Sequence, residues 1–237
     1  MPASDPAPQR PEGRPVGRRA FLGIVGVGIS SLVWGDTATR WLSGAADALP
    51  GPVRGILPSS GWRIYAINPP YPRYDPATWR LQVDGLVERP RSFSMAELQA
   101  LPRADQTSDF HCVTGWSVDD VHWGGVRFKD LLAAVGPTAG AVGLSFVSAE
   151  EDYVDTLTLQ QAAVPDAMLA YEMDHAPISR PHGAPVRVVM PQMYGYKGVK
   201  WLQRITVVDR IEDGYWEGRG YDRDAWVGKS NDFSKGL

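Results

Sequence analysis

The order of short apolar segments after residue 60 limits what this chain can fold into. Trp79, Leu81 and Val83 alternate with polar residues, which predicts a strand that ends in a turn near Gly85. Farther along, strand-like and helix-like segments follow one another without the regular strand–helix alternation of a doubly wound sheet. This order favours an α+β fold with a mixed or antiparallel sheet.

Three short helices are predicted by their end signals. Ser94 and Glu97 form a capping box at the start of the first helix, and Pro102 stops it. The second helix, within 126–136, ends in a glycine, and Thr158 precedes the third. Further strands are expected where apolar and β-branched residues gather, at 142–149, 185–191 and 201–210.

The N-terminal part of the chain differs in composition from the rest. Residues 1–17 are rich in proline and polar side chains, so we expect no fixed structure there. Arg18 and Arg19 precede an apolar run, 21–34, and this combination is typical of a bacterial twin-arginine export signal. We therefore expect 1–48 to be a disordered N-terminus plus a signal, or an uncleaved anchor, and 49–237 to be one domain. A buried helix after a chance arginine pair is the alternative.

Composition excludes several classes of function. The formal net charge is −3 and no stripe of Lys and Arg is present, so nucleic acid is not an expected partner. A single cysteine allows no internal disulfide, no zinc pattern built from CxxC pairs and no CxxCH haem attachment. The four histidines show no HExxH spacing.

The single cysteine, Cys112, has three interpretations. A free thiol is often buried and inert. It can also be a nucleophile, in which case His175 or His182 would be its partner, since the neighbouring His111 points to the opposite face of a strand. Thirdly, a thiolate is a soft ligand for a transition metal, but one cysteine cannot build a protein-only site. A cofactor would then have to bring the other ligands.

Two linked segments resemble a known family. "HCVTGWSVDDVHWGGVRFKDLL" (111–132) is similar to the molybdenum-binding segment of the sulfite oxidase family, and "HGAPVRVVMPQMYGYKGVKWLQRI" (182–205) is similar to its pterin-binding block. Within that family the resemblance is greatest to periplasmic methionine sulfoxide reductase catalytic subunits. It implies a sulfite-oxidase-type molybdopterin-binding fold with mixed β-sheets and short helices, without the C-terminal immunoglobulin-like domain of eukaryotic sulfite oxidases. The implied cofactor is molybdenum–molybdopterin.

The resemblance also implies roles for individual residues. Cys112 would be the catalytic thiolate ligand of molybdenum. The residues implied in cofactor binding are Asn68, Tyr71, Ser148, His182, Arg187, Gly198, Val199 and Lys200. Arg187 and Lys200 would supply charge for the phosphate, and a glycine at 198 would allow close backbone approach. Taken alone, Arg187 alternates with two valines and would be read as a solvent-facing strand residue.

Charge near Cys112 bears on the substrate. No Lys or Arg lies between Phe110 and Gly125, whereas Asp109, Asp119 and Asp120 do lie near the cysteine. A negative rim repels oxyanions, so we expect a neutral S-oxide or N-oxide substrate, such as a methionine-sulfoxide-type compound, reduced by oxygen-atom transfer. The alternatives are a sulfite-type oxidase, a non-catalytic exported ligand-binding domain and a cysteine hydrolase.

Electron supply and the substrate pocket complete these expectations. No haem or flavin motif is present, so the resemblance implies a membrane haem protein or an exported electron carrier as partner. Trp116 and Tyr194 are expected in the pocket wall. The oligomeric state is not predicted.

Overall fold

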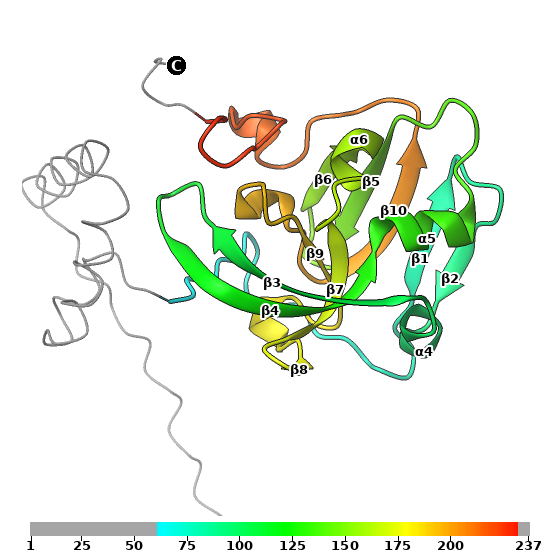
Figure 1. The fold of residues 1–237 in the computed structure, drawn as a ribbon, viewed down its shortest axis with the longest axis horizontal. Coiled ribbons are helices and arrows are strands. Elements are labelled where there is room, and N and C mark those ends of the chain that lie inside the picture. The colour runs from blue at the N-terminus through cyan, green and yellow to red at the C-terminus, as the bar shows by residue number, and fades with distance from the viewer. Residues whose placement is uncertain (1–60, 232–237) are drawn as a thin grey trace, which may run out of the picture. The chain divides into compact units, whose positions relative to one another are not determined.

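The computed structural model of the protein describes residues 61–231. The N-terminal region 1–48 with its twin-arginine stretch lies outside the described residues. Within 61–231, no helix is long and apolar enough to cross a bilayer. The described part contains two β-sheets with a few short helices (Figure 1).

The first sheet is mixed. Its strands run in the order β2-β1-β10-β5-β6, where only the β1–β10 pair is parallel. The predicted strands appear in this sheet as β1 and β10, and the strand expected at 142–149 is β5. The bounds are Leu81–Gly85 for β1, Arg91–Phe93 for β2, Gly143–Ser148 for β5, Val154–Thr158 for β6 and Leu202–Val208 for β10.

The second sheet is antiparallel and carries a long hairpin. Its order is β3-β4-β7-β8, with β9 also paired to β7 (Figure 1). The sequence analysis did not identify β3, β4 or β7. The bounds are Arg103–His111 for β3, Ser117–Arg127 for β4, Met168–Met173 for β7, Ala176–Pro177 for β8 and Arg187–Val189 for β9.

The predicted helix ends are confirmed. Helix α4 (Met95–Gln99) begins at Ser94, whose side chain and that of Glu97 form the capping box. Helix α5 (Phe128–Val135) ends at Gly136 in a left-handed conformation, and α6 (Leu159–Ala162) follows a second capping box at Thr158. The first residues expected in α5 belong to β4 instead. Three 3₁₀ turns complete the fold: η1 (Arg180–His182), η2 (Gly195–Lys197) and η3 (Glu217–Arg219).

The main apolar core packs the mixed sheet against α4, α5 and the second sheet. It includes Leu81, Phe128 and Phe146, all fully buried. A smaller cluster around Trp123 and Met168 lies on the antiparallel sheet, with Phe110 and Trp62 packed against it. The turn of the β3–β4 hairpin is held between these elements, since Val113 packs against the main core and Trp116 is buried.

Candidate functional site

A cavity of about 460 Å³ brings together residues that are far apart in the sequence. Its walls come from the segment 62–67, the β3–β4 hairpin, η1, η2 and residues near the C-terminus. The lining residues include Trp62, Tyr65, Phe110, Cys112, Trp116, Glu150, Tyr153, His182, Arg187, Gly198, Lys200, Tyr215, Trp216 and Tyr221. Five of the predicted site residues, at 112, 182, 187, 198 and 200, therefore meet in one cavity.

Cys112 lies in the turn between β3 and β4. Its backbone N–H donates to the carbonyl of Trp116 at 2.8 Å, and the N–H of Gly115 donates back to the Cys112 carbonyl at 3.0 Å. Gly115 has φ 88°, a left-handed conformation that favours glycine. The thiol is partly exposed, lines the cavity and lies 3.2 Å from the Thr114 hydroxyl. A buried, inert thiol is therefore not what the fold provides.

The two histidines proposed as partners of the thiol differ in position. The ring of His175 stacks on His122, with centroids 3.9 Å apart, and His175 is not among the residues lining the cavity. His182 lines the same cavity as Cys112 and packs edge-on against Trp62.

Arg187 is buried, so its interpretation as a solvent-facing residue is wrong. All of β9 is buried on both faces, and Arg187 is only 3% exposed. Its guanidinium donates to the carbonyl of His182 at 3.1 Å and to that of Gly198 at 3.4 Å. It also lies over the ring of Trp123. A cation is thus held among neutral groups at the edge of the cavity.

The cations at this end of the cavity form no direct ion pair among the described residues, although the Glu150 carboxylate lines the same cavity. Within residues 61–231, none of the ion pairs involves Arg187 or Lys200. Burial lowers the pKa of Arg187 to about 10. Burial and the neighbouring Arg187 lower the pKa of Lys200 to about 7, and burial together with both cations lowers the pKa of His182 to about 4. Such groups favour an anion in the cavity.

Glycines that follow η1 and η2 leave room for these cations. A Cβ on Gly198 would lie 3.1 Å from the nearer Arg187 terminal nitrogen, so glycine leaves room for the guanidinium. Gly183 has φ 107°, and a Cβ there would meet the Lys200 side chain at 2.8 Å. Lys200 itself donates to the carbonyl of Tyr65 and lies 4.3 Å from the centre of the Trp201 ring.

The other predicted site residues do not line this cavity. The Ser148 hydroxyl donates to the Lys200 carbonyl at 2.8 Å, and the Asn68 N–H donates to Glu150 at 2.8 Å. Tyr71 stacks on Trp201 with centroids 5.6 Å apart. Val199 is fully buried and its carbonyl accepts from the N–H of Val188. Ser148 and Asn68 therefore bond to lining residues, whereas the partners of Tyr71 and Val199 named here do not line the cavity.

The two pocket-wall expectations differ in outcome. Trp116 lines the cavity, whereas Tyr194 is not among its lining residues. The N–H of Tyr194 donates instead to the carbonyl of Ala225 at 2.8 Å. Sequence reasoning missed Glu150, a carboxylate that is 4% exposed and lines the cavity. The segment "SAEED" gives no local signal that one of its acids is buried.

A metal ion at Cys112 would need ligands from outside the described chain. Within 61–231, His, Cys, Asp and Glu side chains form no group of three or more placed to hold a metal. A cofactor with its own sulfur ligands and an anionic tail fits this arrangement, because the thiol and the unpaired cations share one cavity.

Comparison with known proteins agrees with this chemistry. Residues 68–216 match the family described as "Oxidoreductase molybdopterin binding domain". This match defines the class of the protein, an oxidoreductase domain of the molybdopterin-binding type. The chain belongs to the sulfite oxidase family of these proteins.

Several relatives place the chain within this family. Over 151 residues it is 38% identical to YuiH, an uncharacterized oxidoreductase of Bacillus subtilis, covering 63% of this chain and 76% of YuiH. Over 156 residues it is 35% identical to YedZ1, a putative protein-methionine-sulfoxide reductase subunit of Azospira oryzae, covering 66% of this chain and 58% of YedZ1. The sulfite oxidase of Arabidopsis thaliana is 29% identical over 178 residues, 61% of this chain and 45% of that enzyme.

The predicted fold class is confirmed by a solved structure. Sulfane dehydrogenase SoxCD of Paracoccus pantotrophus matches with a TM-score of 0.56 at 24% identity, over 60% of this chain and 41% of that chain. At this identity the likeness shows the fold alone. The chain spans less than two thirds of YedZ1, of the Arabidopsis enzyme and of the SoxCD chain.

Proposed function

We propose that this protein is an exported molybdenum-cofactor oxidoreductase that reduces a neutral S-oxide or N-oxide. The observation that carries the proposal is the shared cavity, in which the Cys112 thiol and the unpaired cations Arg187 and Lys200 all take part. A thiolate suits a soft metal, and buried cations suit a phosphate.

Each lining group has a defined task toward the cofactor. Cys112 would hold the metal, while Arg187, Lys200 and His182 would hold the phosphate end. The Glu150 carboxylate lies in the same cavity and suits an amino-pyrimidinone edge, which presents N–H donors. The rings of Trp62, Trp116 and Trp216 would exclude water from the site. When bound, the cofactor supplies two-electron oxygen-atom transfer.

The charge around the hairpin turn supports a neutral substrate. Asp109, Asp119 and Asp120 are exposed, and the Asp120 N–H donates to the Asp109 carboxylate at 3.0 Å. These charges would slow the approach of an oxyanion to the site and would not affect the approach of a neutral molecule. Reduction of a sulfoxide consumes two electrons and two protons, and the oxygen leaves as water. A methionine-sulfoxide-type compound meets this requirement, and the YedZ1 relative supports it.

The source of the electrons is part of the same proposal. The twin-arginine stretch at Arg18 and Arg19 supports export to the periplasm or the outer face of the cytoplasmic membrane. A membrane haem protein or an exported electron carrier would deliver the electrons there. Replacing both arginines by lysine should keep the chain in the cytoplasm, which fractionation of cells measures.

The deciding experiment measures molybdenum and phosphorus in protein purified from a host that makes the cofactor. We expect about one molybdenum per wild-type chain and a labile or absent metal in Cys112→Ser, because serine is a poor ligand for a soft metal. Loaded protein is then assayed with reduced viologen and sulfoxides, and separately with sulfite and an electron acceptor. Faster turnover of sulfite would replace the reductase proposal by a sulfite-type oxidase. Folded wild-type protein without molybdenum would leave a ligand-binding domain.

A further inference from the structure

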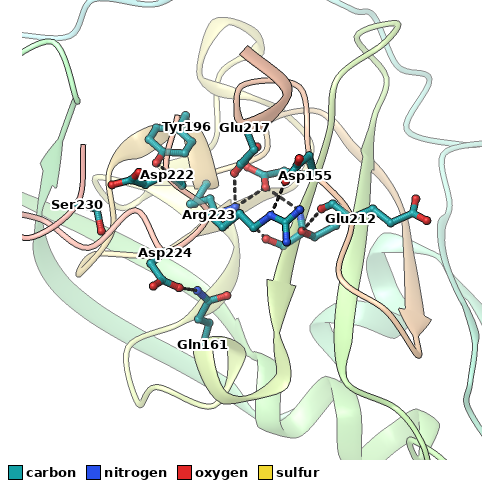
Figure 2. Close-up of polar contacts among 12 residues, drawn as sticks. Asp155, Gln161, Tyr196, Glu212, Glu217, Asp222, Arg223, Asp224 and Ser230 are labelled. Atoms are coloured by element: carbon teal, nitrogen blue, oxygen red, sulfur yellow. Dashed lines mark hydrogen bonds and ion pairs between the residues drawn. The ribbon is translucent and has the colours of Figure 1, made fainter. Parts of the chain in front are cut away.

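A buried ion cluster lies directly behind the cavity wall. The Lys197 ammonium contacts the carboxylates of Asp155, at 2.6 Å, and Glu217, and it donates to the Thr156 carbonyl at 3.0 Å. The side chains of Lys197, Asp155 and Glu217 are 1%, 3% and 2% exposed. Figure 2 shows Asp155 and Glu217 converging from separate segments.

Two members of the cluster, Lys197 and Glu217, are next in sequence to residues that line the cavity. Lys197 stands between Tyr196 and Gly198, and Glu217 directly follows Trp216. None of the three charged residues lines the cavity itself. Their charges therefore join the back of the cofactor-binding segment η2 to the back of the segment that carries Trp216.

That second segment, residues 213–231, is called here the aromatic segment. It contributes Tyr215, Trp216 and Tyr221 to the cavity, and their rings pack against one another with centroids 5.1 to 5.2 Å apart. It has little regular structure beyond the turn η3. Its position must therefore come from specific contacts.

The aromatic segment also makes backbone and side-chain hydrogen bonds, ring contacts with Tyr153 and Tyr196, and an exposed ion pair. The Tyr215 N–H donates to the Val154 carbonyl at 2.8 Å, and the Tyr196 hydroxyl donates to the Asp222 carbonyl at 2.6 Å. The Arg223–Asp213 pair lies at the surface, with side chains 60% and 46% exposed. Exposed pairs contribute little. Among the charged side chains of this segment, Glu217 alone is buried, and we call its contact with Lys197 the anchor of the segment.

The composition of the cluster indicates a role in arrangement rather than in stability. One cation faces two carboxylates, and one Glu217 oxygen is buried without a partner. Burial, helped by the Glu217 carboxylate and opposed by the Lys197 ammonium, raises the pKa of Asp155 to about 7. A cluster of this kind costs desolvation energy that an apolar packing would not, but it accepts one geometry only.

We propose that Glu217, acting through Lys197, is a positioning residue that holds the aromatic segment as a wall of the active cavity, so that Trp216 and Tyr221 contact the bound substrate. This inference rests on the proposed function for its substrate and on the described contacts for its geometry. Loss of the anchor frees the segment without touching the thiol or the unpaired cations.

The test compares hydrogen–deuterium exchange and kinetics in full-length protein loaded with cofactor. Glu217→Ala removes the anchor and leaves the Lys197–Asp155 pair balanced. We expect amide exchange within 213–231 to be roughly tenfold to a hundredfold faster, with β5 and β10 unchanged, because a buried pair is lost. KM for the sulfoxide should rise about tenfold while kcat and molybdenum content stay near wild type.

Two further variants separate positioning from general damage. Glu217→Gln keeps an acceptor oxygen for Lys197 and should restore most of the protection and the low KM. Glu212→Ala is the matched control, because Glu212 is 67% exposed and pairs with Arg210 on the surface. This variant should change neither the exchange within 213–231 nor KM. Unchanged exchange in Glu217→Ala, or faster exchange with an unchanged KM, would overturn the proposal.

A variant-free measurement covers the case in which Glu217→Ala does not fold. In wild-type protein, saturating sulfoxide should slow exchange at Trp216 and Tyr221 relative to the substrate-free state, and equal exchange in the two states would overturn the inference. Wild-type protein that carries molybdenum but does not turn over sulfoxides would refute the reductase assignment. In that case, slower exchange at these residues upon cofactor loading still supports the inference that the aromatic segment forms a wall of the cavity. Equal exchange in apo and loaded protein refutes that inference.

Discussion

The Ser148 hydroxyl donates a hydrogen bond to the Lys200 carbonyl at 2.8 Å, and it accepts one from the Glu150 N–H at 3.0 Å. Ser148 is 6% exposed and does not line the cavity. One buried hydroxyl therefore ties together the backbones that carry a cation and a carboxylate of the site. Its role is to hold both residues in place.

Ser148→Ala should lower the free energy of unfolding by about 1–2 kcal/mol, because a buried carbonyl and a buried N–H lose their partner. Molybdenum content should fall only modestly, since the lining side chains remain. Urea unfolding of the apoprotein and metal analysis measure the two effects. Ser145→Ala, on the same strand, is the control and should stay within about 0.5 kcal/mol. A complete loss of molybdenum without loss of stability would show that the hydroxyl touches the cofactor.

Arg187→Met should separate cofactor binding from folding. The buried guanidinium has no carboxylate partner among the described ion pairs, so its removal should leave apoprotein stability within about 1 kcal/mol of wild type. Cofactor content should drop more than about tenfold, because the phosphate loses charge-assisted donors. Metal and phosphorus analysis beside thermal unfolding measures both. Arg204→Met, whose side chain is 53% exposed and paired with Asp84, should retain the cofactor.

If Arg187→Met unfolded the apoprotein and yet refolded with full cofactor, the guanidinium would be a structural group. Arg187→Lys is a further check, because lysine lacks the planar donor fork of arginine. It should bind the cofactor more weakly than wild type although its charge is unchanged.

Local signals in the sequence identified the elements that begin or end with special residues. The capping box at Ser94 and the glycine at 136 act within a few residues, so no distant contact is needed to recognise them. Strand β1 was recognisable because Leu81 and Val83, which share one face, alternate with polar residues. These features specify local conformation and leave sheet pairing open.

The strands that carry the cysteine were not recognisable. Strand β3 has the sequence RADQTSDFH, with exposed polar residues along one face, and Gly124 with Gly125 interrupts the pattern in β4. A Cβ on Gly125 would lie 1.9 Å from the Leu169 carbonyl oxygen. Glycine is therefore required at this position by the close approach of β7, a strand distant in sequence. Pairing over such separations leaves no local pattern.

The site was only partly recoverable for the same reason. The family resemblance assigned Cys112, His182, Arg187 and Lys200 to cofactor binding, but it could not separate lining residues from supporting ones such as Ser148. Burial of Glu150 and Lys197 depends on partners from other segments. Charged residues are usually exposed, and no local pattern in the sequence indicates that these two are buried.

The stability of the apoprotein should depend on pH through Lys200. Its pKa is about 7 when folded, below the ordinary 10.5, so between these values the unfolded chain binds more protons. Lys200 therefore destabilises the fold fully below pH 7, and this penalty shrinks as pH rises toward 10.5. Lys200→Met should be more stable than wild type at pH 6.5, with an advantage that shrinks toward pH 10.

Thermal unfolding of wild type and variant across this pH range measures the difference directly. Lys129→Met, on the exposed face of α5, is the control and should give a pH-independent difference. Inorganic pyrophosphate should bind wild-type apoprotein more weakly as pH rises through 7, because the ammonium loses its proton. A Lys200→Met advantage that stays constant between pH 6.5 and 10 would mean that the amine titrates as if in water.

Gly195→Ala should disturb the wall beside the cysteine. A Cβ there would lie 2.2 Å from Phe110 Cζ, and Phe110 packs against Trp62 and Trp116 with centroids 4.8 and 5.6 Å away. The ring must move, which should cost about 1–3 kcal/mol as overpacking does. Cofactor retention should fall as well, since all three rings line the cavity.

Gly218→Ala is the matched control: a Cβ there meets nothing within 4 Å, so stability should stay equal or rise by about 0.4–1 kcal/mol. Equal unfolding midpoints for the two variants would mean that Phe110 has room to rotate without disturbing the cavity.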